Sequence, residues 1–224
     1  MKLAIKLAIA VIGTLCPLVL ASEKAHAVSS APSVSVEAAL ARLTDGNKRF
    51  VAGALTHPAQ SIERRAETAQ GQHPFAVILT CADSRLSPEI IFDQGIGDLF
   101  VVRNAGNLVD DLVLGSIEYA VEHLHAPLIV VLGHTKCGAV SAAVAGGEAP
   151  GHIKNIVASL SPAVDMAKKK PGDQVDNAVR IAAKLSAAAL AQNEPILGEL
   201  VKAGKIKVLA ARYDIATGQV EFLP

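Results

Sequence analysis

Residues 75–85 read FAVILTCADSR, a continuous apolar run that ends in a polar, cysteine-containing segment. A short apolar run of this kind, here Phe75 to Thr80, is typical of a strand buried on both faces of a parallel sheet. Two later runs, Leu99 to Val102 and Leu128 to Leu132, repeat the pattern. Helical sequence lies between the three runs, at Pro88 to Phe92 and at Leu112 to Leu124. This alternation predicts an α/β fold with a mostly parallel central β-sheet flanked by helices.

The rest of the chain extends the same pattern on both sides of these strands. Ser35 is placed to cap a helix, because Glu37 lies in the first turn and apolar residues follow at helical spacing. A Thr217-Gly218 turn predicts a C-terminal edge hairpin. The further expected elements are helices over 36–52, 61–69, 152–167 and 176–191, a helix that starts at Pro195, and strands over 206–213 and 220–223.

Composition indicates a globular protein with a small substrate. The chain has 224 residues, of which 51% are hydrophobic, so it can bury a full core. Lysine and arginine number 21, as do aspartate and glutamate, and no basic stripe is present. A nucleic-acid partner therefore has no electrostatic support. With no internal repeat, we expect a single domain over residues 35–224.

The first 27 residues have the pattern of a secretory signal peptide. Lys2 and Lys6 precede an apolar stretch, which is followed by the small-x-small sequence Ala25-His26-Ala27. That stretch is shorter than the roughly 20 apolar residues of a membrane span, so no stable membrane anchor is expected after cleavage. Residues 28–34 are expected to form a flexible leader. These features predict a periplasmic or secreted protein.

Cysteine and histidine follow two of the predicted strands. Cys81 and Asp83 come directly after the first strand, and His134 and Cys137 follow the third. The carboxyl ends of parallel strands border the usual ligand crevice of such a sheet, so we expect these side chains to meet there. Two thiolates and an imidazole suit Zn²⁺, one ion per chain, with water or the Asp83 carboxylate in the fourth position. A disulfide between the two cysteines and a purely structural zinc are the alternatives.

Three motifs in this region resemble those of the β-class carbonic anhydrases. They are CADSR at residues 81–85, FVVRNAGN at 100–107 and GHTKCGA at 133–139. The similarity extends to Tyr213-Asp214 and Thr217-Gly218, and it spans about residues 35–223.

The resemblance implies a role for each matching residue. Zinc would be bound by Cys81, His134 and Cys137, with Asp83 and Arg85 as a catalytic pair. In the family's active form the arginine holds the aspartate away from the metal; in the inactive form the aspartate becomes the fourth ligand.

The resemblance also implies a substrate pocket and an oligomer. Gln72 matches a position that hydrogen-bonds substrate, and Phe100, Ala105 and Gly138 match positions that line a small apolar pocket. The subunits of the family form homodimers, and often dimers of dimers. Members inhibited by bicarbonate carry tryptophan three residues before the first zinc cysteine, where this chain has Ile78. We therefore expect no bicarbonate-inhibited state.

The expected reaction is the reversible hydration of carbon dioxide to bicarbonate and a proton. A carbonyl sulfide or carbon disulfide hydrolase on the same fold is one alternative, and a non-catalytic zinc-binding or redox protein is another. Arg103, at the end of the second strand, is expected to satisfy carbonyl groups or a neighbouring carboxylate rather than to act in catalysis.

Overall fold

The computed structural model describes residues 34–224. The predicted signal peptide and residues 28–33 of the predicted leader lie outside the described residues. Within the part that is described, no helix is both long enough and apolar enough to cross a membrane. In chain order the elements are α1 (Val36–Val51), α2 (Ile62–Thr68), β1 (Ala76–Cys81), α3 (Pro88–Ile91), β2 (Leu99–Asn104), α4 (Asp111–Glu122), β3 (Leu128–His134), α5 (Gly138–Ala145), α6 (Ile153–Ala167), α7 (Gln174–Ala191), α8 (Leu197–Lys202), β4 (Lys207–Tyr213) and β5 (Val220–Leu223).

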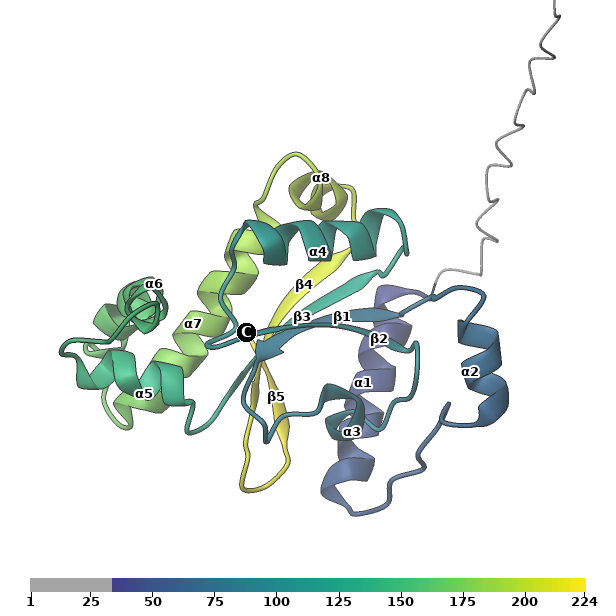
Figure 1. The fold of residues 1–224 in the computed structure, drawn as a ribbon, viewed down its shortest axis with the longest axis horizontal. Helices are drawn as coiled ribbons and strands as arrows, with labels where there is room; N and C mark the ends of the chain where they lie inside the picture. Colours follow the sequence, from purple (N-terminus) through teal and green to yellow (C-terminus); the bar gives the residue numbers. More distant parts are fainter. Residues whose placement is uncertain (1–33) are drawn as a thin grey trace, which may run out of the picture. The chain divides into compact units, whose positions relative to one another are not determined.

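The strands form one five-stranded sheet in the order β2-β1-β3-β4-β5 (Figure 1). Strands β2, β1, β3 and β4 are mutually parallel, and β5 pairs antiparallel with β4 at the edge. The mostly parallel α/β sheet and its C-terminal edge hairpin are therefore confirmed.

Helices cover both faces of this sheet, as the continuous apolar runs predicted. Ile78 and Val130 point into one cluster of buried side chains, which includes residues of α1, α3, α5 and α6. Val77 and Ile129 belong to a second cluster, which includes residues of α4 and α8. Helix α7 contributes to both clusters, because its first turns pack on one and its last turns on the other. All six residues of β1 are buried.

The strand order places a topological switch point at the carboxyl ends of β1 and β3. From β1 the chain passes through α3 to β2 on one side, whereas from β3 it passes through α5 to α8 and returns as β4 on the other side. The segments that leave these two neighbouring strands therefore diverge. Ligand sites in open α/β sheets lie at such a switch point.

The structure corrects two details of the sequence analysis. All three apolar strands extend beyond their predicted ends, because the parallel ladder continues through Cys81 opposite Asn104 and through His134 opposite Tyr213. Helix α5 was not predicted at all. Its sequence, GAVSAAVA, is made of small residues with little amphipathic periodicity, so no helical face stands out.

Candidate active site

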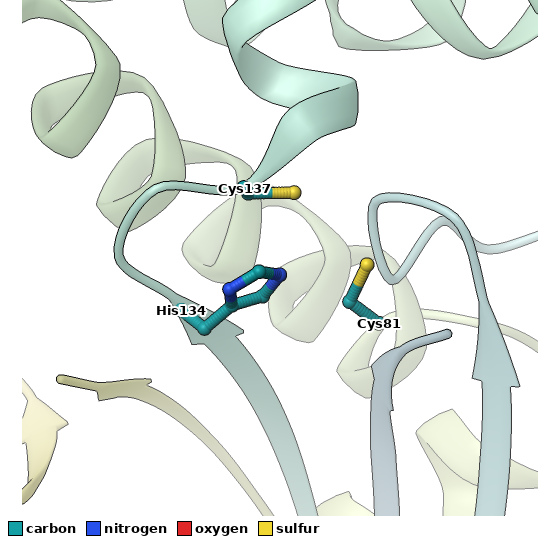
Figure 2. Close-up of side chains that lie close together, drawn as sticks. All are labelled: Cys81, His134 and Cys137. Atoms are coloured by element: carbon teal, nitrogen blue, oxygen red, sulfur yellow. The ribbon is translucent and has the colours of Figure 1, made fainter. Parts of the chain in front are cut away.

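Two strands and one helix bring together the three predicted metal ligands. Cys81 is the last residue of β1, His134 is the last residue of β3, and Cys137 is the N-cap residue of α5. Their donor atoms all lie within 4.8 Å of one another, and all three residues are buried. Figure 2 shows both sulfur atoms and the imidazole converging on one point. The two cysteines are free thiols, so the structure contains no disulfide between them.

The hydrogen bonding of His134 leaves one ring nitrogen available to a metal. The imidazole Nδ1 lies 2.9 Å from the carbonyl oxygen of Thr135, which can only accept, so Nδ1 carries the proton. Nε2 then presents a lone pair. This atom is completely buried and has no hydrogen-bond partner in the described part of the chain. A buried nitrogen without a partner is rare, and a metal ion satisfies it.

The surroundings of the two sulfurs favour a thiolate. The main-chain N–H of Gly106 donates to Cys81 Sγ at 3.4 Å. The pKa of Cys81 is held well below its usual range by the Cys137 thiol that donates to it, against the opposing effect of burial, and the Gly106 N–H lowers it further. The same contact and burial raise the pKa of Cys137. Metal binding would therefore release the proton of Cys137.

Asp83 is fixed beside the ligands by Arg85. The guanidinium donates from Nε to Asp83 Oδ1 at 2.9 Å and from Nη2 to Oδ2 at 2.6 Å, and the Arg85 main-chain N–H donates to Oδ1 at 3.0 Å. The Arg85 hydrogen bonds hold the pKa of Asp83 well below its usual range, although burial opposes this. Asp83 Oδ2 lies 3.9 Å from His134 Nε2, so an ionised oxygen faces the metal ligands.

Arg103 supports this segment through its main chain. It donates from Nε to the carbonyl of Cys81 at 3.1 Å and from Nη2 to the carbonyl of Asp83 at 2.8 Å. The expectation that Arg103 satisfies carbonyl groups is confirmed.

The four predicted substrate residues lie in two different places. Ala105 precedes Gly106, the donor to Cys81, and Gly138 is the first residue of α5, so both are close to the ligands in the chain. Phe100 lies opposite Val77 and roughly 13 Å upstream of the carboxyl end of β2, at about 3.3 Å per residue. Gln72 is exposed and precedes the amino end of β1. Within one chain, Phe100 and Gln72 therefore do not join the other site residues.

Two contributors to the site were not identified from the sequence. The Gly106 N–H that donates to Cys81 and the Thr135 carbonyl that orients His134 are both main-chain groups. Main-chain groups leave no residue-type signal, and only the loop geometry reveals them.

The donor set matches zinc, because thiolate and imidazole ligands in a tetrahedral arrangement are those that this ion prefers. Among the described residues 34–224 the group has three protein donors, which leaves one position for a reacting molecule, as in catalytic rather than structural zinc sites. The fold and the site together define a zinc-dependent enzyme of the α/β class.

Comparison with known proteins identifies the family. The family model described as carbonic anhydrase matches residues 76–220. A carbonic anhydrase of Mycolicibacterium smegmatis is 44% identical over 194 residues, which is 85% of this chain and 94% of that one. Carbonic anhydrase 2 of Mycobacterium tuberculosis is also 44% identical, over 84% of this chain and 93% of its own length. The chain therefore belongs to the carbonic anhydrase family.

Solved structures agree with this assignment. The β-carbonic anhydrase CafA of Aspergillus fumigatus is 31% identical, with a TM-score of 0.63 over 84% of this chain and 89% of that one. The β-carbonic anhydrase CcaA is 25% identical, with a TM-score of 0.66 over 83% of this chain and 95% of that one. A tetrameric β-carbonic anhydrase of Sordaria macrospora is 28% identical, with a TM-score of 0.63 over 71% of this chain and 85% of its own.

Proposed function

We propose that this protein hydrates carbon dioxide reversibly to bicarbonate and a proton, with one zinc ion held by Cys81, His134 and Cys137. The observation that carries the proposal is the partnerless Nε2 of His134, which lies within 4.8 Å of both sulfurs and beside an arginine-held carboxylate. When bound, zinc lowers the pKa of water to about 7 and so supplies a hydroxide nucleophile near neutral pH.

Asp83 acts as the orienting acceptor in this reaction. Since its pKa is depressed, the carboxylate stays ionised at neutral pH and can only accept hydrogen bonds. Oδ2 faces the ligands and is available to accept the hydrogen of the attacking hydroxide, which directs an oxygen lone pair toward carbon dioxide. Arg85 keeps the carboxylate in this orientation through its paired hydrogen bonds. Asp83 therefore positions the nucleophile and does not act as a general acid.

The protein also moderates the charge of its two sulfur ligands. Two thiolates donate more negative charge than imidazoles would, which by itself opposes ionisation of water. The Gly106 N–H that donates to Cys81 withdraws part of this charge. Cys137 lies at the N-terminus of α5, where the helix dipole favours negative charge. Both effects lower the electron density that reaches the metal position.

A homodimer, or a dimer of dimers, is supported by features of the described residues. One side of β2 forms the edge of the sheet, and the adjacent helix α4 exposes Leu112 and Tyr119, at 83% and 47% of their surfaces. Phe100 and Gln72, which the family resemblance places in the substrate pocket, lie away from the ligands of their own chain. A second copy of the chain that packs against this edge would bring its own Phe100 and Gln72 toward the ligands of the first, and so complete the substrate pocket. Analytical ultracentrifugation of the purified protein tests this arrangement.

We also propose export to the periplasm or beyond, with residues 1–27 as a cleaved signal peptide and residues 28–34 as a flexible leader. The support is the order of Lys2, Lys6, the apolar stretch and Ala25-His26-Ala27 in the sequence. Intact mass spectrometry of the protein recovered from bacterial periplasm tests it, with Val28 as the expected first residue.

The activity itself is tested by stopped-flow hydration of carbon dioxide with a pH indicator, using zinc-loaded protein. Rapid proton release that disappears on chelation and returns with zinc is expected. If zinc-loaded protein leaves carbon dioxide unchanged but hydrolyses carbonyl sulfide, then carbonyl sulfide and not carbon dioxide is the substrate.

A further inference from the structure

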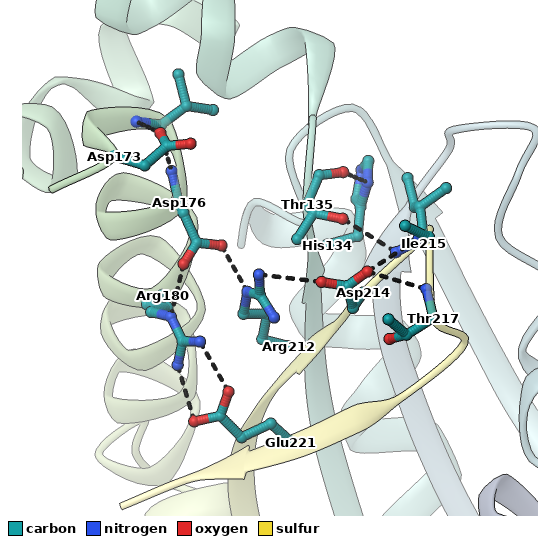
Figure 3. A network of polar contacts seen from close by, with 12 residues as sticks. His134, Thr135, Asp173, Asp176, Arg180, Arg212, Asp214, Ile215, Thr217 and Glu221 are labelled. Atoms are coloured by element: carbon teal, nitrogen blue, oxygen red, sulfur yellow. Dashed lines mark hydrogen bonds and ion pairs between the residues drawn. The ribbon is translucent and has the colours of Figure 1, made fainter. Parts of the chain in front are cut away.

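Thr135 links the histidine ligand to a turn far away in the sequence. Its carbonyl accepts from His134 Nδ1 at 2.9 Å. Its main-chain N–H donates to the carbonyl of Tyr213 at 2.9 Å, and its Oγ1 accepts from the N–H of Ile215 at 3.0 Å. Figure 3 shows the hydrogen bonds that join Thr135 to His134 and to Ile215, beside the β4–β5 turn. Thr135 is therefore held at three atoms.

These bonds control a torsion that the histidine side chain leaves free. Rotation about the bond to the imidazole ring is broad, so the ring needs an external partner to fix its plane. The partner here is the Thr135 carbonyl, and its direction depends on the two bonds that Thr135 makes to β4 and Ile215. Partners that orient a metal-ligating histidine in this way also fix its tautomer.

The turn that presents the Ile215 N–H is itself organised by Asp214. Asp214 Oδ1 accepts from the main-chain N–H groups of Ala216 at 2.9 Å and of Thr217 at 3.1 Å. The Asp214 N–H donates to the Gln219 carbonyl at 2.8 Å, which closes the turn. These backbone donors lower the pKa of Asp214, so the carboxylate remains an acceptor at neutral pH.

A row of charged side chains anchors this turn to α7. Arg212 donates to Asp214 Oδ2 at 3.4 Å and to Asp176 Oδ1 at 2.5 Å. Asp176 in turn accepts from Arg180, which pairs with Glu221 of β5 through two hydrogen bonds (Figure 3). The support for Thr135 thus extends to the helix that packs on β3 and β4.

We propose that Thr135 is a positioning residue for the zinc ligand His134, with the Asp214 turn as its support. Its hydroxyl accepts the Ile215 N–H, and this contact holds the Thr135 carbonyl where it receives the proton of His134 Nδ1. The inference rests on zinc binding at the proposed site. It adds a residue whose contribution is the orientation of a ligand, without contact to the metal or the substrate.

The decisive variant is Thr135→Val, which replaces the hydroxyl by a methyl group of similar size. A methyl group cannot approach the Ile215 nitrogen as closely as Oγ1 does, at 3.0 Å, but Thr135 lines a cavity of about 540 Å³ into which the valine side chain can turn. Zinc affinity, measured by competition with a chromophoric chelator, is expected to fall roughly 10-fold. The absorption bands of the cobalt(II)-substituted protein should shift, because they report the ligand geometry. Thr135→Ser keeps the acceptor and should restore most of the affinity and the wild-type spectrum.

Two further variants separate positioning from general stability. Thr44→Val makes the same change on α1, where the hydroxyl donates to the Leu40 carbonyl, and should leave zinc affinity and spectrum unchanged. Asp214→Ala loosens the turn without touching Thr135 and should weaken zinc binding in the same direction. Asp214→Ala also provides an independent test of the inference if the Thr135→Val protein fails to fold.

Two outcomes would overturn the inference. One is a folded Thr135→Val protein, or an Asp214→Ala protein, with wild-type zinc affinity and cobalt spectrum. The other is an equal loss in Thr135→Ser and Thr135→Val. Because affinity and spectrum are measured without turnover, failure of the carbon dioxide assay leaves this test intact.

Discussion

Arg85 donates a hydrogen bond to each carboxylate oxygen of Asp83, from Nε to Oδ1 at 2.9 Å and from Nη2 to Oδ2 at 2.6 Å. The same Nη2 also donates to the carbonyl of Lys136 at 3.2 Å, in the segment that carries Cys137. The arginine therefore links the two segments that carry the ligands. Both the charge and the shape of the guanidinium hold the Asp83 carboxylate in place, since only a planar guanidinium presents two parallel donors.

Replacement of Arg85 by alanine should separate catalysis from metal binding. Without its partner, Asp83 is free to turn toward the metal ligands, while Cys81, His134 and Cys137 are untouched. We expect zinc content to remain at the wild-type level and turnover to fall by about 100-fold. Elemental analysis and stopped-flow kinetics measure the two quantities. Arg85→Lys retains the charge but not the paired geometry, so an intermediate rate is expected; a wild-type rate in Arg85→Ala would contradict the role given to this pair.

Each of the three ligands should be indispensable. A change of Cys81, His134 or Cys137 to alanine leaves two protein donors, which are too few to hold zinc against water. Activity should be abolished, and bound zinc should fall far below one ion per chain. Full zinc occupancy in Cys81→Ala would show that the ion binds elsewhere.

The ion pair between Asp93 and Arg49 should make stability depend on acid pH. Burial alone would raise the pKa of Asp93, but Arg49 at 2.6 Å and the groups of Thr56 and His57 lower it overall. A carboxyl with a depressed pKa in the folded state stabilises the protein above its unfolded pKa of about 3.9, and this contribution is lost as the pH falls through the folded value.

The variant Asp93→Asn tests this dependence and suits the positive φ of 45° at this position. The metal-free protein should lose about 3 kcal/mol of unfolding free energy at pH 7. Urea unfolding of wild type and variant at pH 7 and pH 3 measures the difference, which should shrink at the lower pH. An equal difference at both pH values would refute the titration of Asp93.

Metal-free protein should form a disulfide between Cys81 and Cys137. Their sulfurs lie within 4.8 Å of each other, and both are free. A diazene oxidant such as diamide would take two electrons and two protons from the thiols, and zinc should then restore activity only after a reductant is added. Thiol counting by mass spectrometry on protein that lacks residues 1–27, and with them the third cysteine of the sequence, Cys16, follows the reaction. Two free thiols after oxidation would show that the fold keeps the sulfurs apart.

Bicarbonate should inhibit this enzyme only as an ordinary product. Ile78 is fully buried in β1, opposite Val101 and Val130, at the position where bicarbonate-regulated relatives were expected to carry tryptophan. A titration with bicarbonate at pH 7 should give a simple hyperbolic loss of rate. Sigmoidal inhibition would contradict this prediction.

Much of the fold was predictable because β1 and β3 are buried on both faces. In 75–80 and 128–132 the apolar runs are continuous, so the prediction of these two strands did not depend on a weak alternation of apolar and polar residues. The ends of the strands were less predictable. Cys81 and His134 are polar or reactive, yet the parallel ladder includes them because their neighbours Asn104 and Tyr213 are in register.

The ligands were predictable for a different reason than their supports. Cysteine and histidine carry their chemistry in the residue type, so their positions after two strands were informative. The role of Thr135 depends on an N–H of Ile215, 80 residues later, that only the folded β4–β5 turn places nearby. Long-range main-chain contacts of this kind have no local pattern in the sequence.

Because Cys81 and Cys137 are separated by roughly 55 residues and share one ion, zinc also works as a cross-link. A covalent bridge over a loop of that length would lower the entropy of the unfolded chain by the equivalent of about 4 kcal/mol. A coordinated ion acts on the same quantity as long as it stays bound, and it joins β1, β3 and the start of α5. The catalytic ion therefore also stabilises the folded state. The free energy of unfolding should rise and fall with the free zinc concentration of the compartment.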